Sequence, residues 1–119
     1  MKLTKTERLI LYSLGQFYRQ LNQPLEEKPV KLRTSKIVFI TFLSHSEIIS
    51  KTERALYKNL ESLEKKKLIA YENRMIRFTD EGLKILEKIG GEIMQFVEIE
   101  KFFLRTKKPS REFQTVISE

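Results

Sequence analysis

Basic side chains between residues 51 and 65 recur at a spacing that would place them on one side of a helix. At about 100° per residue, a leucine face lies roughly opposite a cationic face, with Leu56, Leu60 and Leu63 on the first and Lys51, Arg54, Lys58 and Lys65 on the second. Two arginines, Arg74 and Arg77, follow in a stretch of alternating polarity. Cations gathered in this way suit the binding of a polyanion. The alternative is an ordinary solvated, lysine-rich surface.

The distribution of charge favours a localised basic face. The formal net charge is +7. Residues 1–50 carry eight Lys and Arg against four acids, residues 51–79 again carry eight against four, and residues 80–119 carry seven against eight. The three regions therefore contribute +4, +4 and −1. The basic excess lies in the first two thirds of the chain, and the last third is balanced.

The residue types needed for catalysis or metal binding are scarce. The chain has no cysteine, one histidine and one aspartate. His45 lies in the segment "LSHSE", where a turn residue is the simpler interpretation, and one histidine without cysteine makes a poor metal site. The four glycines form no phosphate-binding loop, and Glu26-Glu27 has no acid–base partner. We expect no enzyme activity, no metal and no cofactor.

Length and composition favour a single domain with an appendage. The 119 residues are 40% apolar and 33% charged, which is enough for a core and against extensive disorder. The N-terminal segment "MKLTKTERLI" has no signal-peptide pattern, and no apolar run reaches 18 residues. We therefore expect a cytoplasmic protein without a membrane partner. Fifteen Glu against one Asp, with fifteen Lys and twelve Ile, is a bias found in thermophile proteomes.

The first half of the chain predicts two helices. Thr4 and Glu7 form a capping box, and an apolar helix face follows at Ile10, Leu14, Phe17, Tyr18 and Leu21. Pro24 should close this helix, and the segment to Arg33 reads as a loop with residues 30–32 extended. Thr34-Ser35 can cap a second helix over residues 36–43. That segment is nearly continuous in β-prone residues, so a buried strand is an alternative to the helix.

The second half predicts a helix, a hairpin and a long helix. Ser50 and Glu53 form another capping box for a helix over residues 51–66. Residues 68–72 and 75–79 alternate like strands joined by Asn73-Arg74, which predicts a two-residue hairpin turn. Thr79 can cap a last helix, in which Gly90-Gly91 should cause a weak point or a kink. Pro109 should end it, leaving residues 109–119 as a tail.

This order of elements is similar to that of a known family. The stretch "ALYKNLESLEKKKLIAYENRMIRFTDEG" resembles the winged helix-turn-helix core of MarR-, PadR- and ArsR-type transcriptional regulators, which commonly read "LE.KG.I", a hairpin and "LT..G". Leu63-Glu64, Leu68-Ile69, Phe78-Thr79 and Gly82 carry the resemblance, which extends over about residues 34–86. Lys67 departs from it, because the family usually has glycine there. The resemblance implies a mainly α (α+β) fold with a short two-stranded wing and an extended C-terminal helix. Together with the composition, it suggests a regulator from a thermophilic prokaryote.

The resemblance also implies a site. In such folds the third helix lies in the major groove of double-stranded DNA, with its N-terminal half toward the bases. Arg makes bidentate contacts to guanine and Asn to adenine, while Lys more often meets phosphate. The expected DNA-binding residues are Lys36, Lys51, Thr52, Arg54, Ala55, Lys58, Asn59, Asn73, Arg74 and Arg77. Asn73 is also expected as a plain turn residue, and Arg77 as a residue that shields the hairpin edge.

The expected organisation is a DNA-binding domain over residues 1–86, a dimerisation helix over residues 87–108 and the tail. Two copies would read a palindromic site as a homodimer. The apolar spacing along the last helix predicts an interface at Ile89, Ile93, Phe96, Val97 and Phe103; alternatively this helix folds back on the first. The predicted function is a sequence-specific DNA-binding transcriptional regulator. The alternative is a winged-helix protein-interaction module in a larger assembly. Whether a small-molecule effector binds is left open by the sequence.

Overall fold

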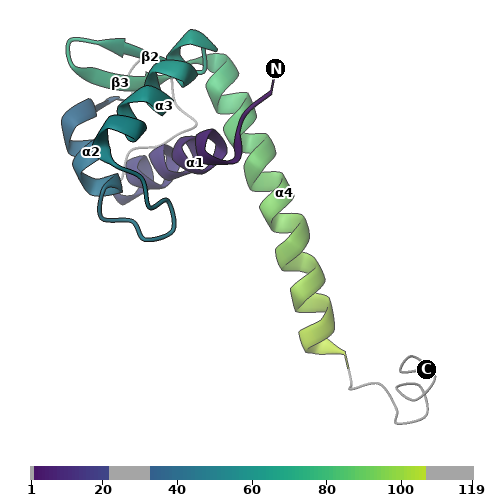
Figure 1. Ribbon diagram of the computed structural model, residues 1–119. Coiled ribbons are helices and arrows are strands. Elements are labelled where there is room, and N and C mark those ends of the chain that lie inside the picture. The colour runs from purple at the N-terminus through teal and green to yellow at the C-terminus, as the bar shows by residue number, and fades with distance from the viewer. Residues whose placement is uncertain (1, 22–32, 107–119) are drawn as a thin grey trace. The chain divides into compact units, whose positions relative to one another are not determined.

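The protein is mainly helical with a small antiparallel sheet. A computed structural model describes residues 2–21 and 33–106 (Figure 1). The elements in these residues are α1 (Lys5–Gln20), β1 (Arg33–Ser35), α2 (Lys36–Leu43), α3 (Glu53–Lys65), β2 (Ile69–Glu72), β3 (Met75–Phe78) and α4 (Asp80–Arg105). The predictions for Pro24, residues 30–32, Pro109 and the tail fall outside the described residues.

Helix α1 begins with the predicted capping box. The Thr4 side chain accepts a hydrogen bond from the Glu7 backbone at 3.0 Å, and the Glu7 carboxylate accepts one from the Thr4 backbone at 2.8 Å. The expected apolar face is buried at Ile10, Leu14, Phe17 and Tyr18. Leu21 was expected on the same face but is 47% exposed, because it is the C-cap and no longer follows the helical spacing.

Residues 36–43 form a helix, so the alternative of a buried strand is wrong. Ser35 caps it as expected, since its side chain accepts from the Val38 backbone at 3.3 Å. The three residues before it form β1, a strand that the sequence analysis missed. β1 pairs antiparallel with β3, with Ser35 opposite Met75.

Helix α3 starts two residues later than predicted. Its N-cap is Thr52, whose side chain accepts from the Ala55 backbone at 3.2 Å. Ser50 cannot fill this role, because an N-cap has an extended backbone, whereas Ser50 has φ 46°. The prediction of a capping box at Ser50 and Glu53 is therefore wrong. The leucine face is confirmed: Leu56, Leu60 and Leu63 are buried.

A left-handed residue ends α3 and turns the chain into the hairpin. Lys67, which stands where the regulators that the sequence resembles usually have glycine, has φ 62°. The Lys67 backbone donates to Glu64 at 2.9 Å and the Leu68 backbone donates to Leu63 at 3.1 Å. These two bonds make a Schellman motif, for which the left-handed conformation is required. Lys67 therefore takes the left-handed conformation that glycine most easily adopts, at the conformational cost that a side chain adds there.

The hairpin has the predicted turn and sits in a three-stranded sheet of order β1-β3-β2. Asn73 and Arg74 have φ 52° and 64°, as a type I′ turn demands. Thr79 then caps α4 through a 3.0 Å bond from the Gly82 backbone. A Cβ on Gly82 would lie 1.9 Å from the Leu68 carbonyl oxygen, so only glycine allows α4 to start this close to the end of α3.

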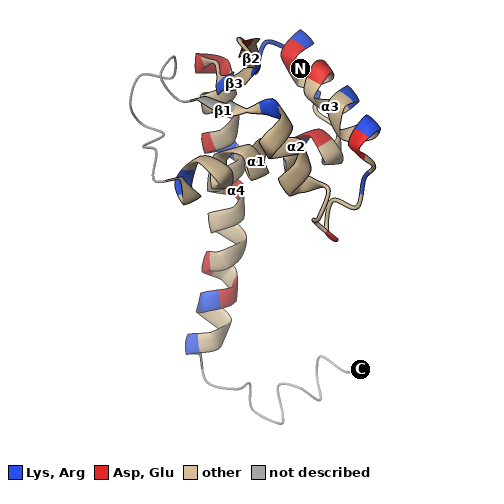
Figure 2. Ribbon diagram, turned by 90° about the vertical axis from the view of Figure 1, so that its left-hand side faces the viewer, with Lys and Arg blue, Asp and Glu red and all other residues tan. Residues whose placement is uncertain are grey.

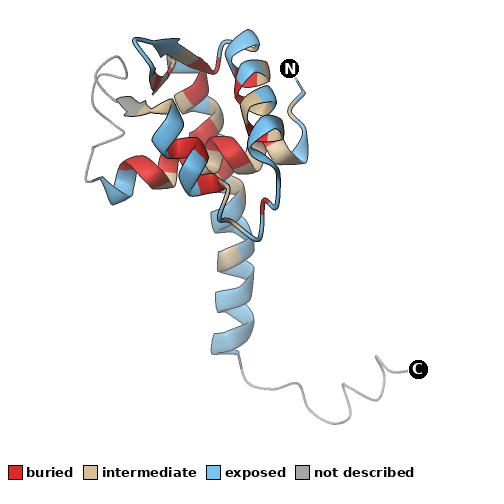
Figure 3. Cartoon of the chain, turned by 60° about the vertical axis from the view of Figure 1, so that its left-hand side comes forward, coloured by how far each residue is buried: buried red, intermediate tan, exposed pale blue. Residues whose placement is uncertain are grey.

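The chain divides into two compact units, Met1–Ile89 and Gly90–Glu119. In the first, the buried sides of α1, α2 and α3 enclose one core together with the sheet (Figure 3). Leu86 and Ile89 of α4 belong to that core. α4 itself continues as helix through Gly90 and Gly91. The second unit contains the remaining residues of α4, and most of the side chains there are exposed.

One buried carboxylate joins the first and third helices. Glu7 is 2% exposed. Besides its capping bond, it accepts from the Ser62 hydroxyl at 2.6 Å and from the Lys66 ammonium at 2.7 and 2.9 Å. Burial by itself raises the pKa of Glu7, but the hydrogen bonds from Lys66, Ser62 and Thr4 and the charge of Lys66 outweigh it and lower the pKa to about 2.

Glu7 should make the free energy of unfolding depend on pH in the acidic range. A carboxyl group whose pKa is lower in the folded than in the unfolded chain stabilises above the unfolded pKa and loses that effect as pH falls toward the folded pKa. Between pH 5 and 2 the wild type should therefore lose roughly 2–3 kcal/mol more unfolding free energy than Glu7→Gln. Denaturant titrations at several pH values measure this. For Lys66→Met, the free energy of unfolding should change less steeply with pH than for the wild type. Parallel curves for wild type and Glu7→Gln would contradict the assignment.

Candidate nucleic-acid interface

Helix α3 presents its expected cations to solvent. Arg54 and Lys58 are exposed, and they lie on the side away from the buried leucines. Ala55 and Asn59 are half-buried on one flank. The Asn59 amide donates to the Ala55 carbonyl of its own helix at 2.8 Å. One of the two amide hydrogens of Asn59 is therefore already used within the helix. The exposed Arg54 guanidinium keeps both of the donors that a bidentate contact needs, so it is the better placed of the two.

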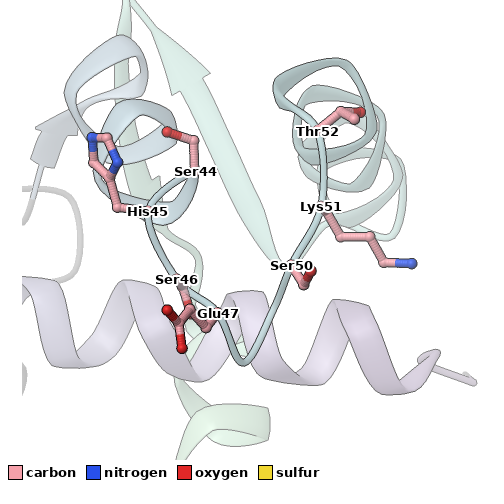
Figure 4. Close-up of a pocket in the computed structure, with 7 residues that line it drawn as sticks. All are labelled: Ser44, His45, Ser46, Glu47, Ser50, Lys51 and Thr52. Carbon is pink, nitrogen blue, oxygen red and sulfur yellow. The ribbon is translucent and has the colours of Figure 1, made fainter.

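The segment before α3 forms a shallow polar hollow. It has a volume of about 340 Å³ and is lined by Ser44, His45, Ser46, Glu47, Ser50, Lys51 and Thr52 (Figure 4). Lys51 precedes the N-cap, so the structure places it beside α3 and not on it. The side chains of Lys51 and His45 extend to different sides in Figure 4. The hollow is therefore no convergent pocket for a small ligand.

Lys36 brings α2, α3 and the hairpin to one point. Its ammonium nitrogen lies 4.1 Å from the ring centroid of Tyr71 on β2 and 5.5 Å from that of Tyr57 on α3. Its backbone N–H donates to the Arg74 carbonyl at 3.1 Å. Three of the elements that carry expected contact residues therefore meet at this lysine.

The hairpin residues differ in their exposure and in their ion pairing. Arg74 is exposed at the turn, and Asn73 beside it takes the left-handed conformation expected of a turn residue. Arg77 is 22% exposed, and its guanidinium lies 3.4 Å from the Glu72 carboxylate. Part of its charge is thus compensated within the hairpin. Of the two arginines, Arg74 is the more available to an external anion.

Acidic residues divide the basic face. Figure 2 shows basic and acidic positions alternating along α3. Glu53 and Glu61 are exposed on that helix, and Glu72 on the hairpin. The face therefore consists of separate cations and not of an unbroken positive surface.

The expected interface residues of α4 have two environments. Ile89 is 5% exposed and part of the core of the first unit. In the second unit Ile93 is 37%, Phe96 75% and Phe103 70% exposed, and Val97 is half-buried. The exposed apolar surface thus starts at Ile93, with Ile99 and Leu104 contributing to it.

The comparisons and the searches for other kinds of site are negative. No family model, curated protein or solved structure matches the chain. Among the described residues no group of His, Asp and Glu is arranged to hold a metal ion. Within that same part of the chain, no helix combines the length and the apolar character needed to span a bilayer.

The sequence does not indicate that two tyrosines contact Lys36. Tyr57 is predicted to pack at the boundary of the core, which it does, and Tyr71 lies in a predicted strand. Lys36 and Tyr71 are 35 positions apart in the sequence, so no local spacing relates them. The pairing of β3 with both β1 and β2 places them in one sheet region. An aromatic residue on the exposed side of a hairpin otherwise rich in charge was the available signal.

The corrected start of α3 can be checked by substitution. Thr52→Ala removes the side-chain acceptor for the Ala55 backbone and should lower the free energy of unfolding by about 1 kcal/mol. Ser50→Ala is the matched control. It removes a hydroxyl two residues away and should leave stability within about 0.5 kcal/mol. Chemical denaturation of both variants gives the comparison. The reverse ranking would place the N-cap at Ser50.

Proposed function

We propose that this protein is a winged helix-turn-helix transcriptional regulator that binds double-stranded DNA sequence-specifically as a homodimer. The observation that carries the proposal is the meeting of α2, α3 and the β2–β3 hairpin at Lys36, beside the exposed cations of α3. A helix of this kind enters a major groove while a neighbouring hairpin follows the backbone. The sheet order β1-β3-β2 and the position of α3 before the hairpin support this fold.

Each cation then has a role set by its chemistry and place. Arg54, in the first turn of α3, reads a base edge, because its guanidinium can donate twice to guanine. Lys51 and Lys58 hold phosphates, which fix register without reading sequence. Arg74 meets the backbone from the hairpin turn. The short hairpin favours contact along the phosphates over deep insertion into the minor groove.

The second unit supports the homodimer. Five of its apolar residues fall at helical steps of three, four or seven, as in a seam between helices: Ile93, Phe96, Val97, Phe103 and Leu104. All of these but the half-buried Val97 are exposed, and Met94, Ile99 and Phe102 are exposed at other positions around the helix. A surface of this kind usually marks an interface. The near balance of charge over residues 80–119 lets two copies approach without strong repulsion.

One observation favours the protein-interaction alternative. Ile37, Val38 and Phe42 on α2 are 61%, 53% and 54% exposed. An apolar strip on the helix beside α3 is suited to a protein surface and is unsuited to DNA phosphate. If the full chain shows no salt-dependent DNA binding, this strip becomes the candidate interface of a winged-helix module in a larger assembly.

The roles assigned to Arg54 and Lys58 can be told apart by how DNA binding depends on salt concentration. Sites selected from a random duplex pool by the full chain are titrated by mobility shift at two salt concentrations. Arg54→Ala should weaken the selected site by ~1–3 kcal/mol and relax preference at one position. Lys58→Ala should weaken all sequences alike and lower the salt slope by ~0.9. Lys88→Ala, an exposed lysine in the part of α4 that belongs to the first unit, is the charge control. Unchanged binding by both α3 variants would refute the assignment.

The interface prediction concerns oligomeric state. The full chain should sediment as a dimer of the 14.2 kDa chain, and Phe96→Glu should shift it toward monomer because it puts a charge in the apolar seam. Phe102→Glu is the matched control, since Phe102 is also exposed but lies about 120° around the helix from Phe96. A monomer at every concentration rules the dimer out. A dimer that survives Phe96→Glu but not Phe102→Glu moves the interface to the other side of α4.

A further inference from the structure

Lys36 holds the hairpin turn in two ways at once. Its backbone N–H donates to the carbonyl of Arg74 at 3.1 Å, which extends the β1–β3 pairing by one step to the turn. Its ammonium nitrogen lies over the faces of Tyr71 and Tyr57, at 4.1 and 5.5 Å from the ring centroids. One residue at the start of α2 thereby contacts both the hairpin and α3.

The side-chain contacts depend on ring faces and not on hydroxyl groups. A lysine ammonium within about 6 Å of an aromatic centroid is attracted by the ring quadrupole, and tyrosine and phenylalanine both provide this attraction. Tyr71 is 37% exposed and Tyr57 half-buried. The ammonium has three N–H donors, so at least one stays available for a further acceptor when two ring faces are engaged.

We propose that Lys36, Tyr57 and Tyr71 form a clasp that positions the hairpin turn, so that Arg74 meets the DNA backbone from a fixed place beside α3. The inference rests on the proposed DNA binding and deepens it. The two tyrosines are positioning residues: they act through Lys36 and Arg74 and need no contact with DNA. Lys36 combines both functions, since its remaining donors face the same polyanion.

A fixed turn has a measurable consequence. A hairpin with four-residue strands and a turn that carries one exposed arginine is marginal alone, and a mobile turn would have to be ordered at each binding event. Ordering on binding lowers affinity. The clasp removes this cost before DNA arrives, and it makes the contribution of Arg74 depend on the presence of the ring faces.

A double-mutant cycle between Tyr71 and Arg74 tests the clasp. In the wild-type background, Arg74→Ala should weaken binding and lower the salt slope by up to ~0.9. Tyr71→Leu alone should weaken binding about two- to fivefold, although it removes no charge. In the Tyr71→Leu background, Arg74→Ala should add little, because the arginine is no longer positioned. Tyr71→Phe, which keeps the ring face, should match the wild type in both measurements.

The remaining variants keep the test decisive. Tyr57→Leu repeats the cycle from α3, should Tyr71→Leu fail to fold by circular dichroism. Lys36→Arg should preserve binding and Lys36→Met should lower both affinity and salt slope. If Arg74→Ala costs the same in the wild-type, Tyr71→Leu and Tyr57→Leu backgrounds, the clasp does not exist. If the wild type shows no salt-dependent DNA binding at all, the proposed function fails instead, and the two failures are distinct.

Discussion

The ion pair between Glu7 and Lys66 is the constraint on which the arrangement of the domain depends. Glu7 caps α1 from within, and Lys66 is the C-cap of α3. A buried carboxylate stripped of its partners would leave an uncompensated charge in the core, which is among the costliest defects a fold can carry. The pair therefore fixes where α3 ends relative to the start of α1. The left-handed Lys67 follows directly, so the same pair also fixes where the hairpin begins.

The elements that the sequence predicted well are those whose signals are local. The leucine spacing of α3 and the alternation around Asn73 depend on neighbours within a few residues, and both agree with the structure. Strand β1 could not be found in this way, because three residues without apolar alternation become a strand only by pairing with β3 far along the chain. Ser50 misled for a related reason: the S-x-x-E pattern was present, but the backbone at Ser50 is left-handed.

The same distinction between local and long-range signals applies to the candidate site. Arg54 and Lys58 were expected on the exposed side of α3, and they lie there, because one helix wheel decides both its buried and its exposed face. The environment of Lys36 was not predictable, since it arises from a sheet register and a ring on another strand. Nor was the Asn59 amide bond to Ala55, which depends on a rotamer choice that spacing does not specify. The local sequence pattern therefore predicts which residues lie on the exposed face of α3, whereas the contacts of those residues with other elements depend on long-range pairing.

The interspersed acids bear on how such a face can work. Glu53 and Glu61 lie on the same helix as Arg54 and Lys58, so the summed attraction for a polyanion is smaller than the net charge of +7 suggests. Weak general attraction leaves binding to a few directional contacts, and a single helix offers few of them. For the proposed DNA binding, a second copy would double the contacts, and the gain in affinity would come from linkage and not from added charge. In the proposed dimer, the neutral, apolar second unit would suit that linkage, because it would join two copies without adding to the repulsion between their basic faces.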